Sequence, residues 1–449
     1  MKKTENAVWS FFASVKLALI TLLILATTSI IGTIIPQKNP PEFYIQNFGP
    51  KTAQFFQLLD VPDMYNSWWF TALLLLFSIN LIVCTIERLP NVWQMVVMNN
   101  LDTPIDRLEK MPTRKIFHGS ASRQEMTQRV AAQLKEAGWP SQMEEKTNGT
   151  LLFSQKGAWS RLGVYAVHLS ILIIFAGAII GSAAGFKASV MIPEGSSTDT
   201  VYEYGSEKPI PLGFNVACDQ FSVTYYDDGH TPREYRSVLT VRDSALAAPM
   251  TRPIIVNDPL DYRGITFYQS SYQPMQGFGV TITNKTSNAS EDFQIPYGKK
   301  ISWAGTDIEF GLINQQARSR MGDVSHVKFW FSDGQGDPAT LWMEDKSTQS
   351  LSRQDAEYEI TVRQLYATGL QVAKDPGVWV VYFGCSLMLI GLYVAFFLSH
   401  RRIWVYITEE AGNSRILLCG ASSKNKIGFD KDFAALTERF EKNDVFQNA

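Results

Sequence analysis

The sequence predicts an integral membrane protein with four transmembrane helices and a large extracytoplasmic β-rich domain of sandwich-like or barrel-like fold. Three patterns favour this fold class. Apolar residues are concentrated in four long runs of the 449-residue chain. Basic residues gather at the ends of those runs that would share one side of a membrane. The segment between the third and fourth runs alternates apolar and polar residues, as β-strands do.

Four runs are long enough to cross a membrane as helices. Crossing about 30 Å of hydrocarbon takes roughly 20 residues at about 1.5 Å per residue. The first helix and a cytoplasmic N-terminus take up residues 1–35, with the helix itself over 17–35. The other helices are predicted over 68–86, 162–184 and 378–398. A cleaved signal peptide is the alternative for the first run, but the run is long and lacks a clean small-x-small site.

Basic residues set the expected orientation. They flank the first run on its N-terminal side, follow the second and fourth runs, and precede the third. These residues are Lys2, Lys3, Lys16, Arg88, Lys156, Arg161, Arg401 and Arg402. All lie on one side if both termini are cytoplasmic. A Lys-rich start without an Arg- and Ser-rich transit segment favours a bacterial inner (plasma) membrane.

This orientation assigns the segments between the helices. Residues 36–67 form a short extracytoplasmic loop, and residues 87–161 form a cytoplasmic loop. That loop carries a predicted amphipathic helix over Arg123–Ala137, where apolar residues recur at helical spacing. Residues 399–449 form a cytoplasmic tail with a short helix over Phe433–Phe440.

Residues 185–377 are predicted to form the β-rich domain. Alternating apolar residues and intervening turn signals such as Ser332-Asp333-Gly334 indicate many short strands. The expected strands are Phe214–Cys218, Phe221–Tyr225, Ser237–Val241, Thr266–Tyr268, Gly279–Thr283, Asp307–Leu312, Val327–Phe331 and Tyr358–Val362. This spacing is typical of a sandwich or an open barrel.

Composition and absent motifs exclude several classes of protein. The formal net charge of −2 gives no basic surplus suited to nucleic acid. The sequence has no phosphate-binding glycine loop, HExxH, GxSxG or CxxCH. The four cysteines, Cys84, Cys218, Cys385 and Cys419, form no CxxC pair and fall in different predicted compartments. Neither a thiol reductant nor a disulfide framework is expected.

His168 is the main candidate for a functional residue. It lies about 10 Å inside the third predicted helix, counted from the cytoplasmic end. Ionisable residues inside a membrane are costly and usually face a partner, a cavity or a cofactor. A neutral imidazole is a good axial ligand for haem iron. The other interpretation, a histidine hydrogen-bonded to a neighbouring helix, has equal weight on residue chemistry alone.

The remaining polar and small residues favour simpler roles. His400, at the cytoplasmic end of the fourth helix, is a weaker candidate for cofactor binding and is more typical of an interfacial cap. His118, His230 and His326 fall in soluble segments. Asn80 in the second helix favours helix–helix hydrogen bonding. Glycines in the third helix give a smooth face for close helix packing, and they are Gly163, Gly177, Gly181 and Gly185.

The chain resembles the ResB (CcsB) family, a component of System II cytochrome c biogenesis. The resemblance covers nearly the whole chain, and its motifs occur in the family's order. The motifs are Gly32-Thr-Ile-Ile-Pro36-Gln37, Ser67-Trp-Trp-Phe70, Asn80-Leu-Ile-Val-Cys84, Pro211-Leu-Gly-Phe214, Pro232-Arg-Glu-Tyr235, Val256-Asn257-Asp-Pro259-Leu260, Gly264-Ile-Thr-Phe-Tyr268-Gln269-Ser-Ser-Tyr272, Thr368-Gly-Leu-Gln371, Lys374-Asp-Pro-Gly377 and Ser399-His400-Arg-Arg-Ile-Trp404. Each is weak alone, but the ordered set is specific.

The resemblance implies a function. It implies a non-catalytic or co-catalytic subunit of a haem lyase complex, acting with a CcsA/ResC-type membrane protein and with apocytochrome c. The pair would export haem b, bound transiently, and attach it to apocytochrome c outside the membrane. A tryptophan-rich haem-binding segment is absent here, because Trp68-Trp69 precedes Phe70 rather than an aspartate. That departure implies that this segment lies on a separate partner chain.

The resemblance also implies that His168 is a haem ligand within the membrane, sharing iron with a partner histidine. The segment Tyr268–Tyr272 is a candidate surface for apocytochrome c, with a buried strand as the alternative. Three other functions remain open at this point. They are a scaffold that does not bind haem, an extracytoplasmic ligand sensor and a transporter, although the sequence lacks signalling motifs and inverted repeats.

Overall fold

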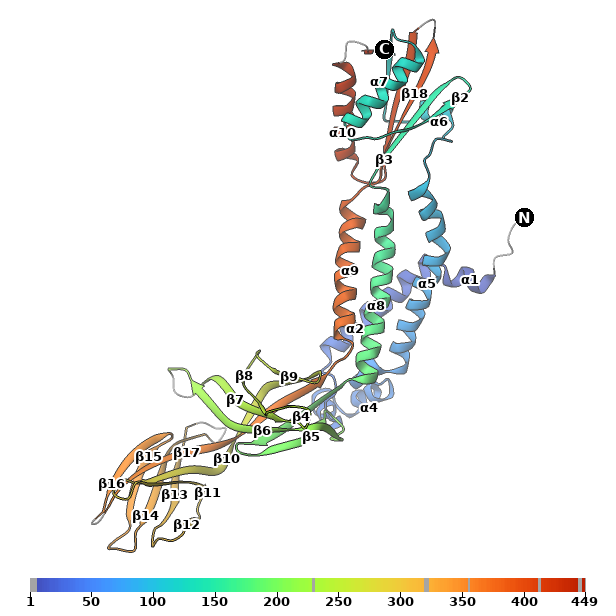
Figure 1. Ribbon diagram of the computed structural model, residues 1–449. Coiled ribbons are helices and arrows are strands. Elements are labelled where there is room, and N and C mark those ends of the chain that lie inside the picture. The colour runs from blue at the N-terminus through green and yellow to red at the C-terminus, as the bar shows by residue number, and fades with distance from the viewer. Residues whose placement is uncertain are drawn as a thin grey trace. The chain divides into compact units, whose positions relative to one another are not determined.

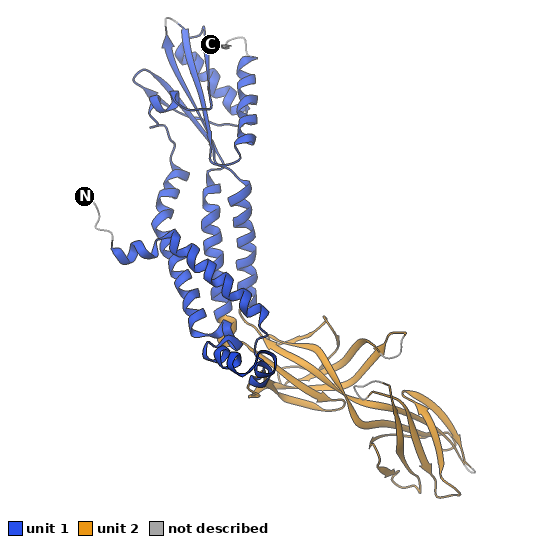
Figure 2. Cartoon of the chain, turned by 180° about the vertical axis from the view of Figure 1, so that it is seen from behind, with its two compact units in different colours: residues 1–179, 378–449 blue, residues 180–377 orange. Residues whose placement is uncertain are grey.

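The computed structural model describes residues 6–227, 231–318, 323–353, 356–410, 413–442 and 446–448. The chain divides into two compact units, residues 1–179 with 378–449, and residues 180–377 (Figure 2). Four helices in the described residues are long and apolar enough to cross a membrane. A large β-rich unit accompanies them. The predicted fold class of four membrane helices and a β-rich domain is therefore confirmed.

The four apolar helices are α2 (Val15–Ile34), α5 (Trp68–Val97), α8 (Gly163–Ala184) and α9 (Val378–Phe397). Helix α5 is longer than the predicted span and continues through Pro90 to Val97. A short helix, α1 (Ala7–Phe12), precedes α2. The segment between α2 and α5, expected to be a loop, folds into α3 (Pro41–Phe48), α4 (Pro50–Leu58) and the 3₁₀ helix η1 (Val61–Asn66).

Helix α8 lies between α9 and α5 (Figure 1). Glycines allow close approach to α9: a Cβ at Gly163 would lie 2.7 Å from Ala395 N, and one at Gly391 would lie 3.0 Å from Val167 N. A different face of α8 meets α5, where the Phe77 and Phe175 ring centroids are 6.4 Å apart. Small residues thus let the helix backbones pack closely. This close packing stabilises the helix pair in lipid, where the hydrophobic effect does not drive helices together.

A polar contact joins α5 to the break between α1 and α2. The Asn80 amide donates to Phe12 O at 2.6 Å and to Ser14 O at 3.1 Å. These carbonyls need an outside donor because the helix is interrupted there. Asn80 is fully buried, and its predicted role in helix–helix hydrogen bonding is confirmed.

The loop between α5 and α8 and the segment after α9 fold together into one α/β domain. Its six-stranded sheet has the order β2-β3-β18-β19-β1-β20. The strands are β1 (Arg114–Gly119), β2 (Gln142–Lys146), β3 (Gly149–Lys156), β18 (Arg401–Glu410), β19 (Asn413–Ser422) and β20 (Phe446–Asn448). Antiparallel pairing of β18 with β3 joins residues about 250 apart in sequence, and pairing of β19 with β1 joins residues about 300 apart, such as Lys115 and Leu418. The sequence predicted only separate helices in these two segments.

Three helices accompany this sheet: the short α6 (Ile105–Glu109), α7 (Arg123–Glu136) and α10 (Lys426–Glu441). Helix α7 matches the predicted amphipathic helix, and Ser122 caps it by accepting from Glu125 N. Helix α10 is longer than the predicted Phe433–Phe440. Its buried phenylalanines and the apolar face of α7 pack on one side of the sheet.

The β-rich unit contains a ten-stranded sheet and a four-stranded sheet. The larger sheet includes β4 (Phe186–Pro193), β5 (Ser197–Glu203), β6 (Pro209–Tyr225), β7 (Pro232–Arg242), β8 (Met250–Ile255), β9 (Leu260–Tyr262), β10 (Ile265–Asn284), β11 (Ala289–Pro296), β16 (Ser347–Ser352) and β17 (Glu357–Lys374). The smaller comprises β12 (Lys300–Ser302), β13 (Glu309–Ala317), β14 (Val324–Ser332) and β15 (Ala339–Glu344).

Two long paired strands, β10 and β17, run through two separate hydrophobic cores of this unit. Phe267 and Val372 lie in the first core, and Val280 and Ile360 lie in the second. The prediction of short separate strands was wrong here. Thr266–Tyr268 and Gly279–Thr283 belong to one strand, and so do Phe214–Cys218 and Phe221–Tyr225. Bulges shift the register within these strands, so alternation is broken locally while the strand continues.

Candidate functional site

His168 lies on α8 where this helix meets α5. Its Nδ1 forms a hydrogen bond of 3.1 Å with Thr85 Oγ1 of α5. The Tyr165 ring, one helical turn earlier, lies edge-on at 6.1 Å. The imidazole is half-buried, and its Nε2 makes no hydrogen bond with any described residue. One ring nitrogen is therefore held in place and the other is free.

The Thr85 contact has a chemical consequence for the imidazole. A neutral imidazole has one N–H and one lone pair, and the partner of one nitrogen sets which nitrogen carries the proton. When Nδ1–H donates to Thr85 Oγ1, the lone pair is at Nε2. A histidine oriented in this way through its second nitrogen is the usual arrangement at metal sites.

Cys84, next to Thr85 on α5, has a structural role. Its thiol donates to Ala13 O at 3.1 Å, at the same helix break that Asn80 contacts. All four cysteines are described and are free thiols. Cys218 and Cys419 are buried in β-sheet cores, and burial raises the pKa of each thiol to about 12. These two thiols are therefore protonated and poorly suited to bind a metal.

His400 lies just after α9 with both ring nitrogens in hydrogen bonds. Arg161 Nε donates to Nδ1 at 2.8 Å, so Nδ1 must carry the lone pair and Nε2 the proton. Nε2 in turn donates to Gln155 Oε1 at 2.9 Å. The residue is 1% exposed. This geometry leaves His400 no free nitrogen for iron.

Burial, together with the positive charges of Arg161 and Arg402, lowers the pKa of His400 to about 4. His400 is therefore neutral at physiological pH. It connects strand β3 through Gln155, the short segment before α8 through Arg161 and, through its own backbone N–H, the Ser423 hydroxyl after β19. Among the other soluble-segment histidines, His118 lies on β1 and His326 on β14, and His230 lies outside the described residues.

The segment Tyr268–Tyr272 on β10 contains a register shift between Gln269 and Ser271, so buried and exposed side chains do not alternate strictly along it. Gln269 and Tyr272 are each 5% exposed, whereas Tyr268 is 42% exposed. The Gln269 Oε1 accepts hydrogen bonds from the Ser237 and Thr368 hydroxyls. Two of these motif residues therefore stabilise the sheet, and only the outward-facing ones are available to a ligand.

The residues around His168 fit one axial position of a haem iron. A single imidazole with a free Nε2 provides one ligand. The described residues contain no group of three or more His, Cys, Asp or Glu side chains that could hold a metal ion. Sequence reasoning missed Thr85, because a lone threonine in an apolar helix carries no signal of its own.

Taken together, four apolar helices, a membrane-embedded histidine and a β-rich unit between the third and fourth helices define a multi-pass membrane protein. The chain belongs to the ResB-like family, which matches residues 15–349 and 331–434.

Named relatives cover nearly the whole chain. A protein of Gloeobacter violaceus named "Cytochrome c biogenesis protein CcsB" is 28% identical over 96% of this chain and 90% of its own length. A protein of Microcystis aeruginosa with the same name is 28% identical, over 96% and 94% of the two chains. "Cytochrome c biogenesis protein Ccs1" of Porphyra purpurea is 26% identical, over 96% and 95%.

Proposed function

We propose that this protein acts in System II cytochrome c biogenesis as a subunit that supplies one haem ligand from within the membrane. Its family and relatives support the role in cytochrome c biogenesis. The CcsA/ResC-type partner, haem export and covalent attachment of haem to apocytochrome c follow from the resemblance in the sequence. The observation that carries the haem-binding part is the half-buried His168, with Nδ1 on Thr85 and Nε2 free.

His168 would bind iron through Nε2 while Thr85 holds the ring. Ligation by two imidazoles and exclusion of water tune the potential of the iron. The chain provides one imidazole, so a histidine of the partner provides the other. Helices α5 and α8 bring the ligand and its positioning residue together, and the Gly163 and Gly391 contacts fix α8 against α9.

The β-rich unit follows directly from α8 and leads directly into α9. We place this unit on the extracytoplasmic side, with both termini and the α/β domain in the cytoplasm of a bacterial inner membrane. There it would stabilise the partner's extracytoplasmic haem site and position apocytochrome c next to that site. The outward-facing side chains of the Tyr268–Tyr272 segment are the part of this unit that we assign to that contact.

Co-expression with a CcsA-type partner and a reporter apocytochrome c, in a host without its own assembly system, tests the function. Covalent haem on the reporter is measured by haem staining of a denaturing gel. The wild-type pair is expected to produce stained reporter, and the partner alone is expected to produce none.

The same assay tests the site. His168→Ala is expected to lower the stained reporter at least tenfold at equal membrane abundance, by loss of an axial ligand. His118→Ala, a half-buried histidine of the α/β domain, is the matched control and should leave the signal unchanged. Full maturation by His168→Ala would instead make the chain a scaffold that does not ligate haem.

A further inference from the structure

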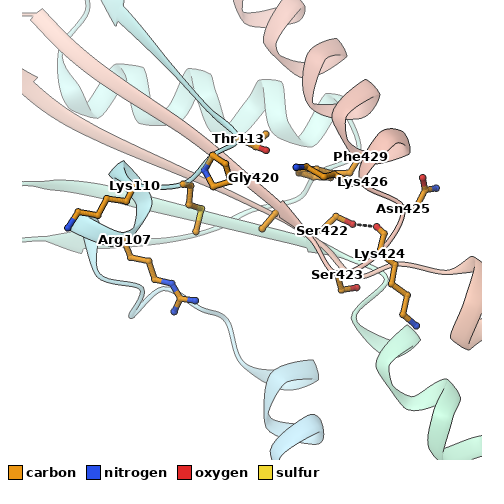
Figure 3. A pocket seen from close by; sticks show the side chains of 13 residues that line it. Arg107, Lys110, Thr113, Gly420, Ser422, Ser423, Lys424, Asn425, Lys426 and Phe429 are labelled. Atoms are coloured by element: carbon orange, nitrogen blue, oxygen red, sulfur yellow. Dashed lines mark hydrogen bonds between the residues drawn. The ribbon is translucent and has the colours of Figure 1, made fainter.

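The α/β domain contains a pocket of about 630 Å³. It lies between the α6 segment and the turn that joins β19 to α10 (Figure 3). Its polar lining includes Arg107, Lys110, Thr113, Ser422, Lys424 and Lys426. Phe429 and Met111 add apolar surface. His168 and Thr85 are not among the residues that line this pocket, so the pocket is distinct from the proposed haem site.

The charge of this pocket is strongly one-sided. Four of its lining side chains are cationic, and no described carboxylate lines it. The side chains of Arg107, Lys110 and Lys426 are exposed and make no ion pair with a described residue. The nearby Glu109 carboxylate does not neutralise these cations, because it pairs with Arg415 at 3.4 Å. The pocket therefore presents several uncompensated positive charges to one small volume.

Hydroxyl groups and a helix start add neutral hydrogen-bond donors to these charges. Ser422, Ser423 and Thr113 line the pocket next to the cations. Helix α10 begins at Lys426, after the Asn425 cap, so its positive end faces the same turn. Gly420 lets the Phe429 ring pack closely against β19, because a Cβ there would lie 2.5 Å from that ring. Cations with hydroxyl donors are the groups that bind phosphate oxygens.

The pocket lies at the end of an apolar helix. The Lys424 ammonium donates to Ala395 O, in the last turn of α9. In Figure 3, the Lys424 side chain points away from the sheet, toward the ends of the long helices. Arg402 is nearby, and burial together with the charges of Arg161 and Arg107 lowers its pKa. The positive region thus extends across the boundary between the apolar helices and the α/β domain.

We propose that this pocket binds the phosphate of an anionic phospholipid headgroup, in the membrane leaflet next to the α/β domain. Basic pockets where helices leave the membrane bind such headgroups, and anionic lipids attract each nearby Lys or Arg. The link from Lys424 to α9 puts the pocket at headgroup level, which favours a lipid over a dissolved ion. The chemistry recognised is a phosphate group, which inorganic phosphate shares.

Native mass spectrometry of the full-length chain in detergent tests this proposal. The protein is titrated with phosphatidylglycerol, with phosphatidylcholine and with inorganic phosphate. The variant Lys110→Gln/Lys426→Gln removes two pocket charges. The control Lys135→Gln/Lys431→Gln removes two exposed charges from α7 and α10 outside the pocket lining. Thermal melting verifies that both variants are folded, and Arg107→Gln serves as a second pocket variant.

The proposal predicts one tightly bound phosphatidylglycerol in the wild type and in the control. The pocket variants should bind it about tenfold more weakly, and phosphatidylcholine should not compete. Equal phosphatidylglycerol binding by wild type and pocket variants would overturn the proposal. Displacement of phosphatidylglycerol by millimolar inorganic phosphate would overturn the lipid assignment and make the pocket a site for a soluble phosphate.

Discussion

Two histidines lie near the same end of the apolar helices, His168 close to the start of α8 and His400 just after α9, and they differ in what their ring nitrogens contact. His168 has one nitrogen on a threonine hydroxyl and one free, whereas His400 has both nitrogens in hydrogen bonds with Arg161 and Gln155. An iron ligand needs a free lone pair. The same residue type therefore provides a candidate ligand in α8 and a structural connection after α9.

Thr85 provides a test of how His168 is held. We predict that Thr85→Val lowers the haem content of the complex roughly tenfold, because loss of a hydrogen bond that orients a metal-binding histidine typically costs 10–100-fold in metal affinity. Thr85→Ser keeps the hydroxyl and should bind haem as the wild type does. The measurement is the haem-to-protein ratio of the purified complex. Equal ratios in all three proteins would show that Thr85 does not position the ring.

His400 should make stability depend on pH. Its pKa is about 4 in the folded chain, below the ordinary value of 6.5, so protonation favours the unfolded state. We predict that the free energy of unfolding falls between pH 6.5 and 4, by roughly 3 kcal/mol at most. Thermal melting from pH 8 to 5 should show a steeper loss in the wild type than in His400→Gln. His118→Gln should keep the wild-type slope, and parallel curves for wild type and His400→Gln would contradict the assignment.

At the residue scale, the predicted helix–helix hydrogen bonding of Asn80 is confirmed, whereas haem ligation by His168 stays a prediction. A polar Asn80 or a histidine in an apolar helix stands out because its burial needs a partner. Thr85 does not stand out, because threonine is tolerated in such helices. The hydrogen bonds of His400 come from Arg161 and Gln155, more than 230 residues earlier in the chain, and no local pattern predicts them.

At the scale of elements, glycine contacts hold α8 against α9. The Gly391 backbone is so close to α8 that an added Cβ would lie 3.0 Å from Val167 N and from Val167 Cγ2. We predict that Gly391→Leu lowers the free energy of unfolding by about 1–3 kcal/mol through overpacking. The thermal midpoint in detergent measures this. Ile390→Leu, at a 61% exposed position on α9, is the control and should melt as the wild type does.

An unchanged midpoint in Gly391→Leu would mean that α8 and α9 are not in close contact. Of the four glycines predicted in the third helix, Gly163 contacts α9, whereas an added Cβ at Gly181 or Gly185 would meet Asp375 or Lys374 before that helix begins. Gly384 and Gly391 of α9 also contribute to this packing, since a Cβ at Gly384 would lie 2.7 Å from Ile174 Cγ1. Regular spacing made the first set visible, whereas two glycines seven residues apart form no recognisable pattern.

At the scale of the whole molecule, the α/β domain constrains the membrane arrangement. Strands β18 and β19 pair with β3 and β1, so the loop after α5 and the segment after α9 belong to one sheet. Both segments must lie on the same side of the membrane. Local periodicity predicted the apolar helices and α7, but strand pairing between distant segments depends on contacts that sequence patterns do not contain.

Single-cysteine labelling can test this arrangement. Lys135→Cys on α7 and Lys431→Cys on α10 should react with a membrane-impermeant maleimide from the same side, and Lys208→Cys in the β-rich unit from the opposite side. In intact cells, we predict labelling of Lys208→Cys only, with the other two labelled after permeabilisation. The wild type, whose Cys84, Cys218 and Cys419 are buried, is the control for background. Labelling of Lys135→Cys and Lys431→Cys from opposite sides would contradict the shared sheet.

Imidazole rescue of a glycine variant tests ligation by His168 most directly. The chain is purified with a CcsA-type partner as wild type and as His168→Gly, and absorption spectra are recorded with and without added imidazole. We predict that His168→Gly loses the low-spin haem bands and that imidazole restores them, because the free ligand replaces the missing side chain. Wild-type haem bands in His168→Gly without imidazole would contradict the claim that His168 binds the iron.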